Sequence, residues 1–145
     1  MNRFSNLRNL GFTLLELILV MAIISILSAL AIPIYIRYQQ KSKVASYALP
    51  MVRACANEAI TYCMSERAAD VSNLTLNVTS FPNCRNATTP VGNLTVNITG
   101  SVTCEETGHV SNCTVFGELE GVNLYQAKCD LRDQSLHCEV IYKNS

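Results

Sequence analysis

The side chains that could carry chemistry in this chain of 145 residues are seven cysteines, two histidines and scattered carboxylates. The sequence contains no CxxC pair, phosphate-binding glycine loop, GxSxG turn or paired-carboxylate motif, so it lacks the signatures of metal, redox and hydrolytic sites. His109 and His137 lie in or beside expected hairpins, where solvated positions are typical. We therefore expect no enzyme, no metal site and no cofactor. The density of cysteines favours disulfides in an oxidising compartment.

Four cysteines fall into two pairs that each enclose eight residues: Cys104 with Cys113, and Cys129 with Cys138. If each pair spans an antiparallel hairpin, the turns are centred on Gly108-His109 and Asp133-Gln134, and a leading glycine suits a type II′ turn. These registers place the cysteines of a pair directly opposite each other, with Cβ atoms about 4.5–5.5 Å apart, near the range that a disulfide can close. The spacing therefore predicts both disulfides.

Three cysteines remain, namely Cys55, Cys63 and Cys84. Eight helical residues separate Cys55 and Cys63 by about 12 Å, so these two cannot bond to each other. Cys84 follows Phe81 in an expected loop and could join that loop to the helix through either cysteine. Because Cys63 is nearer the end of the helix, we expect a Cys63–Cys84 bond, with Cys55 left as a buried thiol. A bond from Cys55 to another subunit is the alternative.

Six asparagines begin the sequence Asn-x-Thr, the acceptor form for N-glycosylation: Asn73, Asn77, Asn86, Asn93, Asn97 and Asn112. Alternating strands place polar residues at i and i+2 without any sugar, which explains four of the six. Asn86 and Asn112 are explained less well. All six are candidate glycosylation sites, and a solvated sheet face is the simpler interpretation.

The first structural element expected in the chain is an apolar segment near the N-terminus. Leu17 to Ile36 are twenty positions without a charge, and as a helix they span roughly 30 Å, the thickness of the bilayer's hydrocarbon core. The preceding residues carry Arg3 and Arg8 and no acidic residue, which places them on the cytoplasmic side. The rest of the chain is then exported. An ordinary secretory signal is the alternative, but the run is long for one and continues into a polar helix.

Glu16 stands at the head of this apolar segment. A carboxylate costs about 2.5–3.5 kcal/mol at the bilayer centre and less near the interface, so it needs a partner. No cation lies within four residues of Glu16 in the sequence. If the chain were cut after Gly11, the new α-amine at Phe12 would stand four positions before Glu16, on the same helical face. The amine could come from the same chain or from a neighbour.

From Arg37 onward the apolar residues follow the spacing of one helical face: Val44, Ala48, Met51, Val52, Cys55, Ala59, Tyr62 and Cys63. A single helix from Phe12 to Met64 would be about 80 Å long. Pro33 and Pro50 each remove a helical hydrogen bond and should kink it. Pro50 could instead end one helix and start another.

The C-terminal half is predicted to be a small β domain. Residues 72–80 and 92–100 are near-copies in which apolar residues alternate with Thr and Asn, as in half-buried strands of one sheet. Residues 136–142 alternate in the same way and should form the final strand. We therefore expect an α+β fold, with a long N-terminal helix packed on a small antiparallel sheet. Its segments are 1–11, 12–36, 37–66 and 67–145.

The sequence Gly11-Phe12-Thr13-Leu14-Leu15-Glu16, followed by the apolar run with Pro33 and Tyr35, resembles the prepilin motif of bacterial type IV pilins. The resemblance covers about a quarter of the chain. It implies that residues 1–11 are a leader, that a prepilin peptidase cuts after Gly11, and that Phe12 is N-methylated. It also implies that Glu16 pairs with a neighbouring subunit's amine during assembly, that Pro33 marks a bend, and that a disulfide near the C-terminus delimits a surface loop.

The resemblance implies a structural subunit of a type IV pilus, a fimbrium that serves adhesion or motility. Its partners would be further pilin subunits, the prepilin peptidase and the assembly platform in the inner membrane. The precursor would be a single-pass inner-membrane protein and the product an extracellular filament. A minor pilin, a type II secretion pseudopilin and an uncleaved membrane-anchored binding module are the alternatives. Loss of Arg3 and Arg8 would leave nine basic residues of the original 11 against 11 acidic ones, which gives no case for a nucleic-acid site.

Overall fold

The computed structural model describes residues 12–65, 73–76, 81–89 and 92–143 of the chain. Contacts within the chain divide it into two units, Met1–Ile36 and Arg37–Ser145. We call the described part of the first unit the stem, and the described part of the second unit the globular domain. Gly11 and Asn77, which the sequence singled out, lie outside the described residues.

The helical backbone continues without a break from Leu14 to Ser65. It consists of α1 (Leu14–Lys43), a π-helical turn η1 (Val44–Ala48) and α2 (Leu49–Ser65). In the π-turn the Leu49 N–H bonds to the Val44 carbonyl, one residue farther back than in an α-helix. Pro50 follows as the second residue of α2, where a missing N–H is tolerated. Pro50 therefore marks a change in the hydrogen-bond ladder, while the helical backbone continues through it.

Pro33 lies inside α1, and the helix is assigned on both sides of it. The proline cannot donate to the ladder at its own position, because it has no N–H. The bends that we expect at Pro33 and Pro50 stay predictions.

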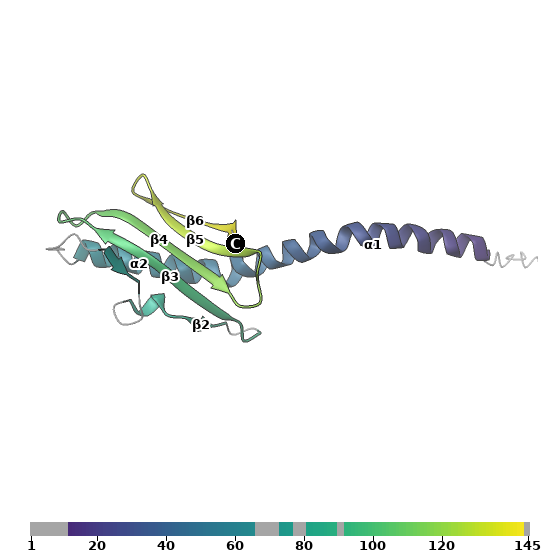
Figure 1. Cartoon of the computed structure of the whole chain (residues 1–145), viewed down its shortest axis with the longest axis horizontal. Coiled ribbons are helices and arrows are strands. Elements are labelled where there is room, and N and C mark those ends of the chain that lie inside the picture. The colour runs from purple at the N-terminus through teal and green to yellow at the C-terminus, as the bar shows by residue number, and fades with distance from the viewer. Residues whose placement is uncertain (1–11, 66–72, 77–80, 90–91, 144–145) are drawn as a thin grey trace, which may run out of the picture. The chain divides into compact units, whose positions relative to one another are not determined.

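The β structure is a single antiparallel sheet in the described part of the chain. Its strands are β1 (Asn73–Thr75), β2 (Ala87–Thr88), β3 (Thr95–Cys104), β4 (Val110–Leu119), β5 (Tyr125–Arg132) and β6 (Ser135–Tyr142). Their order is β1-β3-β4-β5-β6, with β2 also paired to β3 (Figure 1). The near-copy segments thus contribute two paired strands of one sheet, although β1 is short. The predicted α+β class is confirmed.

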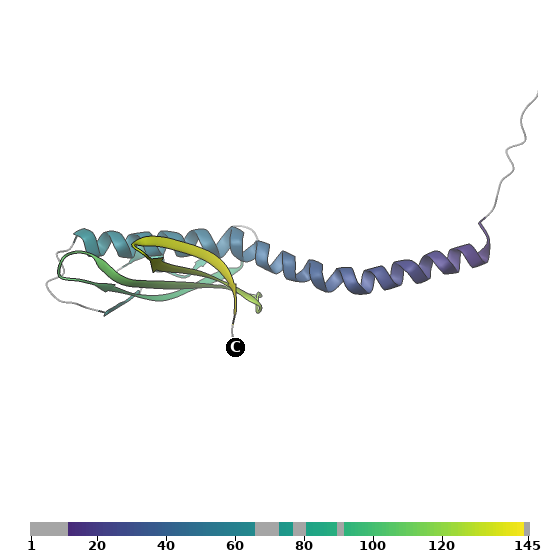
Figure 2. The ribbon, with the colours of Figure 1, turned by 90° about the horizontal axis from the view of Figure 1, so that it is seen from above.

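The core of the globular domain lies between α2 and one face of the sheet (Figure 2). Six of the eight positions expected on the buried helical face are fully buried, whereas Met51 is half-buried and Tyr62 is 37% exposed. The helix packs tightly against the sheet where Ala48 and Val52 face Gly117. A Cβ at Gly117 would collide with Cγ2 of Val52, so a residue without a side chain is required there. Val96, Val102 and Val115 are fully buried on the sheet side.

The β5–β6 hairpin has the predicted geometry. Asp133 and Gln134 form the turn with positive φ angles of 48° and 61°, as a type I′ turn requires. Cys129 lies directly opposite Cys138 in this register. The spacing alone therefore located both the turn and the cross-strand pair.

The β3–β4 hairpin differs from the prediction of a two-residue turn at Gly108-His109. The Glu105 N–H donates to the His109 carbonyl at 2.8 Å, and the Gly108 N–H donates to the Glu105 carbonyl at 2.9 Å. These bonds close a three-residue loop in which Gly108 adopts φ +81°, the left-handed conformation that glycine favours. A register shift between Thr103 and Cys104 then places Cys104 opposite Val110.

Candidate assembly site

The disulfides fix the globular domain, and all seven cysteines lie in its described residues. The Cys129–Cys138 bond is present, with the two Cα atoms 4.1 Å apart. The predicted Cys104–Cys113 bond is wrong, because Cys104 is bonded to Cys63 of α2. The three-residue loop explains the difference, since it closes the hairpin between Glu105 and His109, earlier than the predicted turn, and Cys113 consequently lies opposite Val102.

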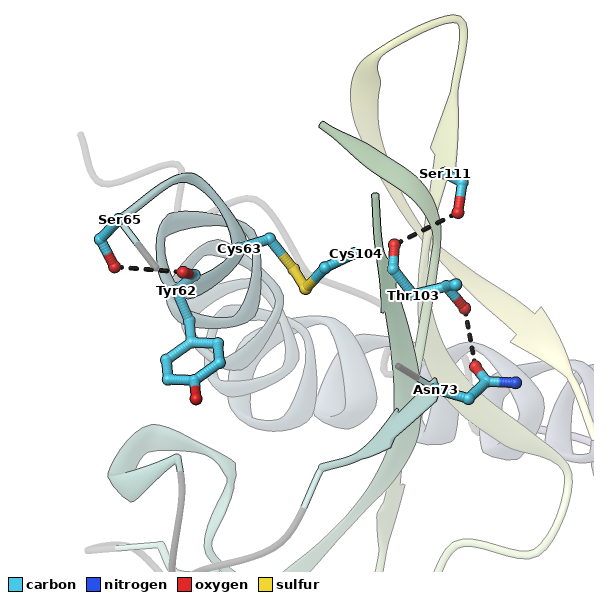
Figure 3. Close-up of a disulfide and its surroundings, with 7 residues drawn as sticks. All are labelled: Tyr62, Cys63, Ser65, Asn73, Thr103, Cys104 and Ser111. Atoms are coloured by element: carbon cyan, nitrogen blue, oxygen red, sulfur yellow. Dashed lines mark hydrogen bonds between the residues drawn. A yellow bond between two sulfur atoms is a disulfide. The ribbon is translucent and has the colours of Figure 1, made fainter. Parts of the chain in front are cut away.

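Figure 3 shows how Cys104 reaches the helix. Its side chain leaves β3 on the side that faces α2 and meets Cys63 there. The preceding residue, Thr103, points to the other face of the sheet, where its hydroxyl donates to the Asn73 Oδ1 at 2.7 Å. Alternation along the strand thus directs one residue to the core and its neighbour to the exterior. The Cys63–Cys104 bond joins the last turns of α2 to the end of β3.

The predicted Cys63–Cys84 bond is also wrong, because Cys84 is bonded to Cys55 with the Cα atoms 4.7 Å apart. Cys84 belongs to η2 (Pro82–Cys84), a short 3-10 helix beside the middle of α2. There the backbone N–H of Asn83 donates to Glu58 Oε2 at 2.8 Å, which holds the turn against the helix. The nearness of Cys63 to the end of the helix therefore did not identify the partner of Cys84.

The remaining thiol is Cys113, in place of the predicted Cys55. Cys113 is fully buried in the core, and burial raises the pKa of its thiol to about 11. A protonated, buried thiol is a poor nucleophile. Cys113 therefore acts as a small core residue in the folded domain.

The candidate glycosylation sites that the structure describes are all exposed: Asn73, Asn86, Asn93, Asn97 and Asn112. The Asn86 Oδ1 accepts the Ile98 N–H at 2.9 Å, so this side chain ties a loop to β3. The Asn112 Oδ1 lies 3.5 Å from the hydroxyl of Thr114, the threonine of its own Asn-x-Thr sequence. Modification at these sites stays a prediction.

The two histidines, His109 and His137, are exposed. Within the described segments there is no group of three or more His, Cys, Asp or Glu side chains that could hold a metal ion.

The stem exposes almost all of the molecule's accessible apolar side chains. No residue of α1 is buried. Among the described residues, all but four of the exposed large hydrophobic side chains lie between Phe12 and Ile36, the exceptions being Tyr38, Tyr62, Met64 and Tyr142. Burying such a side chain contributes about 1.5–3 kcal/mol. By length and composition the helix can cross a membrane. The stem therefore requires an apolar environment that the described residues do not supply.

Thr13 and Glu16 form a reciprocal cap at the start of the stem. The backbone N–H and the hydroxyl of Thr13 both donate to the Glu16 Oε2 at 3.3 Å, and the Glu16 N–H donates to the Thr13 Oγ1 at 3.2 Å. The Leu17 N–H bonds to the Thr13 carbonyl at 3.2 Å and opens the helical ladder. This arrangement is a capping box, whose signature Thr-x-x-Glu is present in the sequence. The charge and spacing of the residues had not identified Thr13 as part of this site.

The cap leaves some hydrogen-bond acceptor positions of the Glu16 carboxylate unused. An ionised carboxylate has about four acceptor positions, and only one of its oxygens is used by Thr13. In the part of the chain that the structure describes, no cation forms an ion pair with Glu16, and its side chain is exposed. The site can therefore accept a cationic donor from outside the described residues.

The fold and the head of the stem define a class of protein, an α+β chain whose apolar N-terminal helix begins with a Thr-x-x-Glu cap. Residues 6–32 match the family model described as the prokaryotic N-terminal methylation motif. The chain is similar to the type IV major pilin protein PilA of Myxococcus xanthus (strain DK1622), with 60% identity over 38 residues. This match covers 26% of the chain and 17% of the relative. No solved structure matches the chain. The two matches support the resemblance to type IV pilins.

Proposed function

We propose that the chain is a structural subunit of a type IV pilus. It enters the inner membrane as a precursor, a prepilin peptidase cleaves it after Gly11, and Phe12 becomes N-methylated. The assembly platform then moves the stem from the membrane into a growing extracellular filament. The match of residues 6–32 to the methylation motif supports the processing steps. Adhesion or motility belongs to the assembled filament.

The observation that carries this proposal is the unburied stem. One chain alone leaves the side chains from Phe12 to Ile36 exposed, while its globular domain has a complete core. Lateral packing of many stems removes that apolar surface from water or lipid, and each added subunit provides the partner surface for the next. A homopolymer therefore buries the apolar surface that the monomer leaves exposed.

The Glu16 carboxylate pairs with the amine of a neighbouring subunit's Phe12 in this proposal. The capping box supports the pairing, because it orients the carboxylate while one oxygen stays free. A charge-assisted bond in an apolar surrounding is stronger than the same bond in water. The pair also sets the register of neighbouring stems.

The test separates the charge of Glu16 from its role in the cap. We expect Glu16→Ala to block assembly while the protein still accumulates in the membrane. Glu16→Gln keeps a side chain that can cap the helix but removes the charge, and it should block assembly as well. Thr13→Ala keeps the carboxylate and should assemble with reduced yield. The measurement is the amount of subunit in sheared filaments relative to the membrane fraction.

Normal filaments from Glu16→Gln would contradict the charge pairing and leave the cap as the essential feature. Absence of the unaltered protein from sheared filaments would contradict the filament function itself. The curated relative is named a major pilin, which supports an abundant subunit. A trace amount in otherwise abundant filaments would instead indicate a minor pilin.

A further inference from the structure

We propose that the distal end of the globular domain docks the base of the same domain in another copy of this chain, several subunits along the filament. This inference rests on the proposed function and adds a second contact between subunits, outside the stem. It is carried by an apolar hollow at one end of the domain, beside a loop with two glutamates. At the other end lies an exposed tyrosine between basic residues.

The distal hollow lies between the last turns of α2 and the two hairpin loops. Its volume is about 370 Å³, and its apolar lining comes from Ile60, Met64, Val110, Leu131 and Leu136. Met64 is 66% exposed, which is unusual for an apolar side chain of this domain. An open apolar hollow of this size can accept one aromatic side chain from a partner.

The β3–β4 loop that contributes to the hollow carries two acidic residues. His109 lines the hollow, and its carbonyl accepts the Glu105 N–H at 2.8 Å, so Glu105 and Glu106 belong to the same loop. Both glutamates are exposed, and neither has an ion-pair partner among the residues that the structure describes. Charges that one chain leaves unpaired favour a basic partner.

The base of the domain provides the complementary group. Arg37, Tyr38 and Lys41 occupy positions i, i+1 and i+4 of α1, so their side chains share one side of the helix. We call them the basal patch. All three are exposed, Tyr38 by 72%, and neither cation is ion-paired within the described part of the chain. A tyrosine suits such a contact because its ring is apolar and its hydroxyl stays wet.

The helix itself fixes the displacement between the two copies. Tyr38 and Met64 are 26 residues apart on one continuous helical run, which corresponds to about 39 Å of rise. The Glu16–Phe12 pairing joins groups only four residues apart, or about 6 Å. The same neighbour therefore cannot make both contacts. The basal patch reaches the distal hollow of a more distant copy, and this contact adds axial cohesion to the lateral packing of stems.

Charge exchange tests the contact. We expect Arg37→Glu/Lys41→Glu and Glu105→Lys/Glu106→Lys each to lower the yield of sheared filaments about fivefold, the effect of a surface ion pair of ordinary strength. The combination of all four substitutions should restore most of the yield. Arg53→Glu is the matched control, because Arg53 is an exposed helical cation outside the basal patch, and it should leave the yield unchanged.

The hollow is tested through Tyr38→Ala, with Tyr142→Ala as the control, since Tyr142 is also exposed, by 57%. Only Tyr38→Ala should lower the yield, and neither variant should change export or the thermal unfolding of the detergent-solubilised monomer. Unchanged filaments from the charge-reversed variants, or a combined variant no better than the weaker of the two, would overturn the contact. That result would leave the filament function standing, because the unaltered protein would still be found in filaments.

Discussion

The two halves of the helical run differ in how their apolar side chains are buried. From Phe12 to Ile36 the run is almost wholly apolar and has no buried residue, whereas α2 buries Val52, Cys55 and Ala59 against the sheet. The difference lies in the pattern of the residues, because a helix that is apolar on every side needs apolar neighbours on every side. The globular domain supplies its own neighbours. In the proposed function, a membrane or other subunits supply the neighbours of the stem.

Covalent bonds follow the same division. The disulfides Cys55–Cys84 and Cys63–Cys104 join α2 to η2 and β3, and the Cys129–Cys138 bond joins β5 to β6. The stem contains no cysteine. Under the proposed function, a domain displayed on a filament surface must stay folded by itself, whereas the stem must leave one apolar environment and enter another.

The largest effect that we predict concerns the Cys63–Cys104 bond. Replacing both cysteines with alanine should lower the free energy of unfolding of the domain by about 4 kcal/mol, because the bond closes a loop with a sequence separation of 41. The Cys129–Cys138 bond spans only 9 residues, and its loss should cost about 2.6 kcal/mol. Denaturant unfolding of the two double variants measures the order, and a larger loss at Cys129–Cys138 would contradict it.

The next prediction compares the same substitution in the two regions. Ile98 is 6% exposed in the core, and Ile98→Ala should lower the free energy of unfolding by about 3 kcal/mol. Ile24 is 52% exposed in the stem, and Ile24→Ala should leave the unfolding of the domain unchanged while it lowers filament yield. Thermal unfolding in detergent and the sheared-filament yield provide the two measurements. A stem variant that destabilised the domain would contradict the claim that the domain folds independently of the stem.

The smallest energetic effect lies on the exterior of the domain, at Asp130. Partial burial acts to raise the pKa of this carboxyl, but the hydrogen bond from Arg132 and the charges of Lys128 and Arg132 outweigh it, so the pKa lies below its ordinary value. Arg132 donates to the carboxylate at 2.8 Å. Because the folded pKa is the lower one, the stabilisation is present at neutral pH and is lost as the pH falls through the folded value.

Asp130→Asn should therefore cost no more than about 1 kcal/mol at pH 7. The difference from the unaltered protein should vanish well below the ordinary carboxyl pKa of 3.8. Urea unfolding at several pH values measures it. A difference that stayed constant with pH would mean that packing, rather than charge, sets the effect.

A labelling experiment tests which cysteine is the free, buried thiol. Cys113 is buried with a pKa of about 11, so an alkylating reagent at neutral pH should leave the folded, unreduced domain unmodified. After denaturation without reduction, one cysteine should react, and peptide mapping should identify it as Cys113. Alkylation of Cys55 would instead support the pairing that the sequence predicted.

Local patterns predicted the parts of the structure that depend on neighbours in sequence. The apolar run, the amphipathic face of α2 and the β5–β6 hairpin with its Cys129–Cys138 bond follow from periodicity and turn position. Thr13 was equally open to prediction from the Thr-x-x-Glu signature.

The two disulfides that α2 forms were not predictable in this way. Cys104 bonds to Cys63 because the three-residue loop of the β3–β4 hairpin removes Cys113 from the opposite position, and because the end of α2 lies against the sheet at that point. The second cause is tertiary. No spacing within the chain specifies where a helix lies on a sheet.

The most direct test of the central claim is the intact mass of the protein taken from sheared filaments without reduction. The claim is that the chain is cut before its stem and assembled through it. We expect a chain that begins at Phe12, carries one methyl group and lacks the two hydrogens of each disulfide. A mass that begins at Met1, or a cut beyond Ile36 that removes the stem, would contradict it.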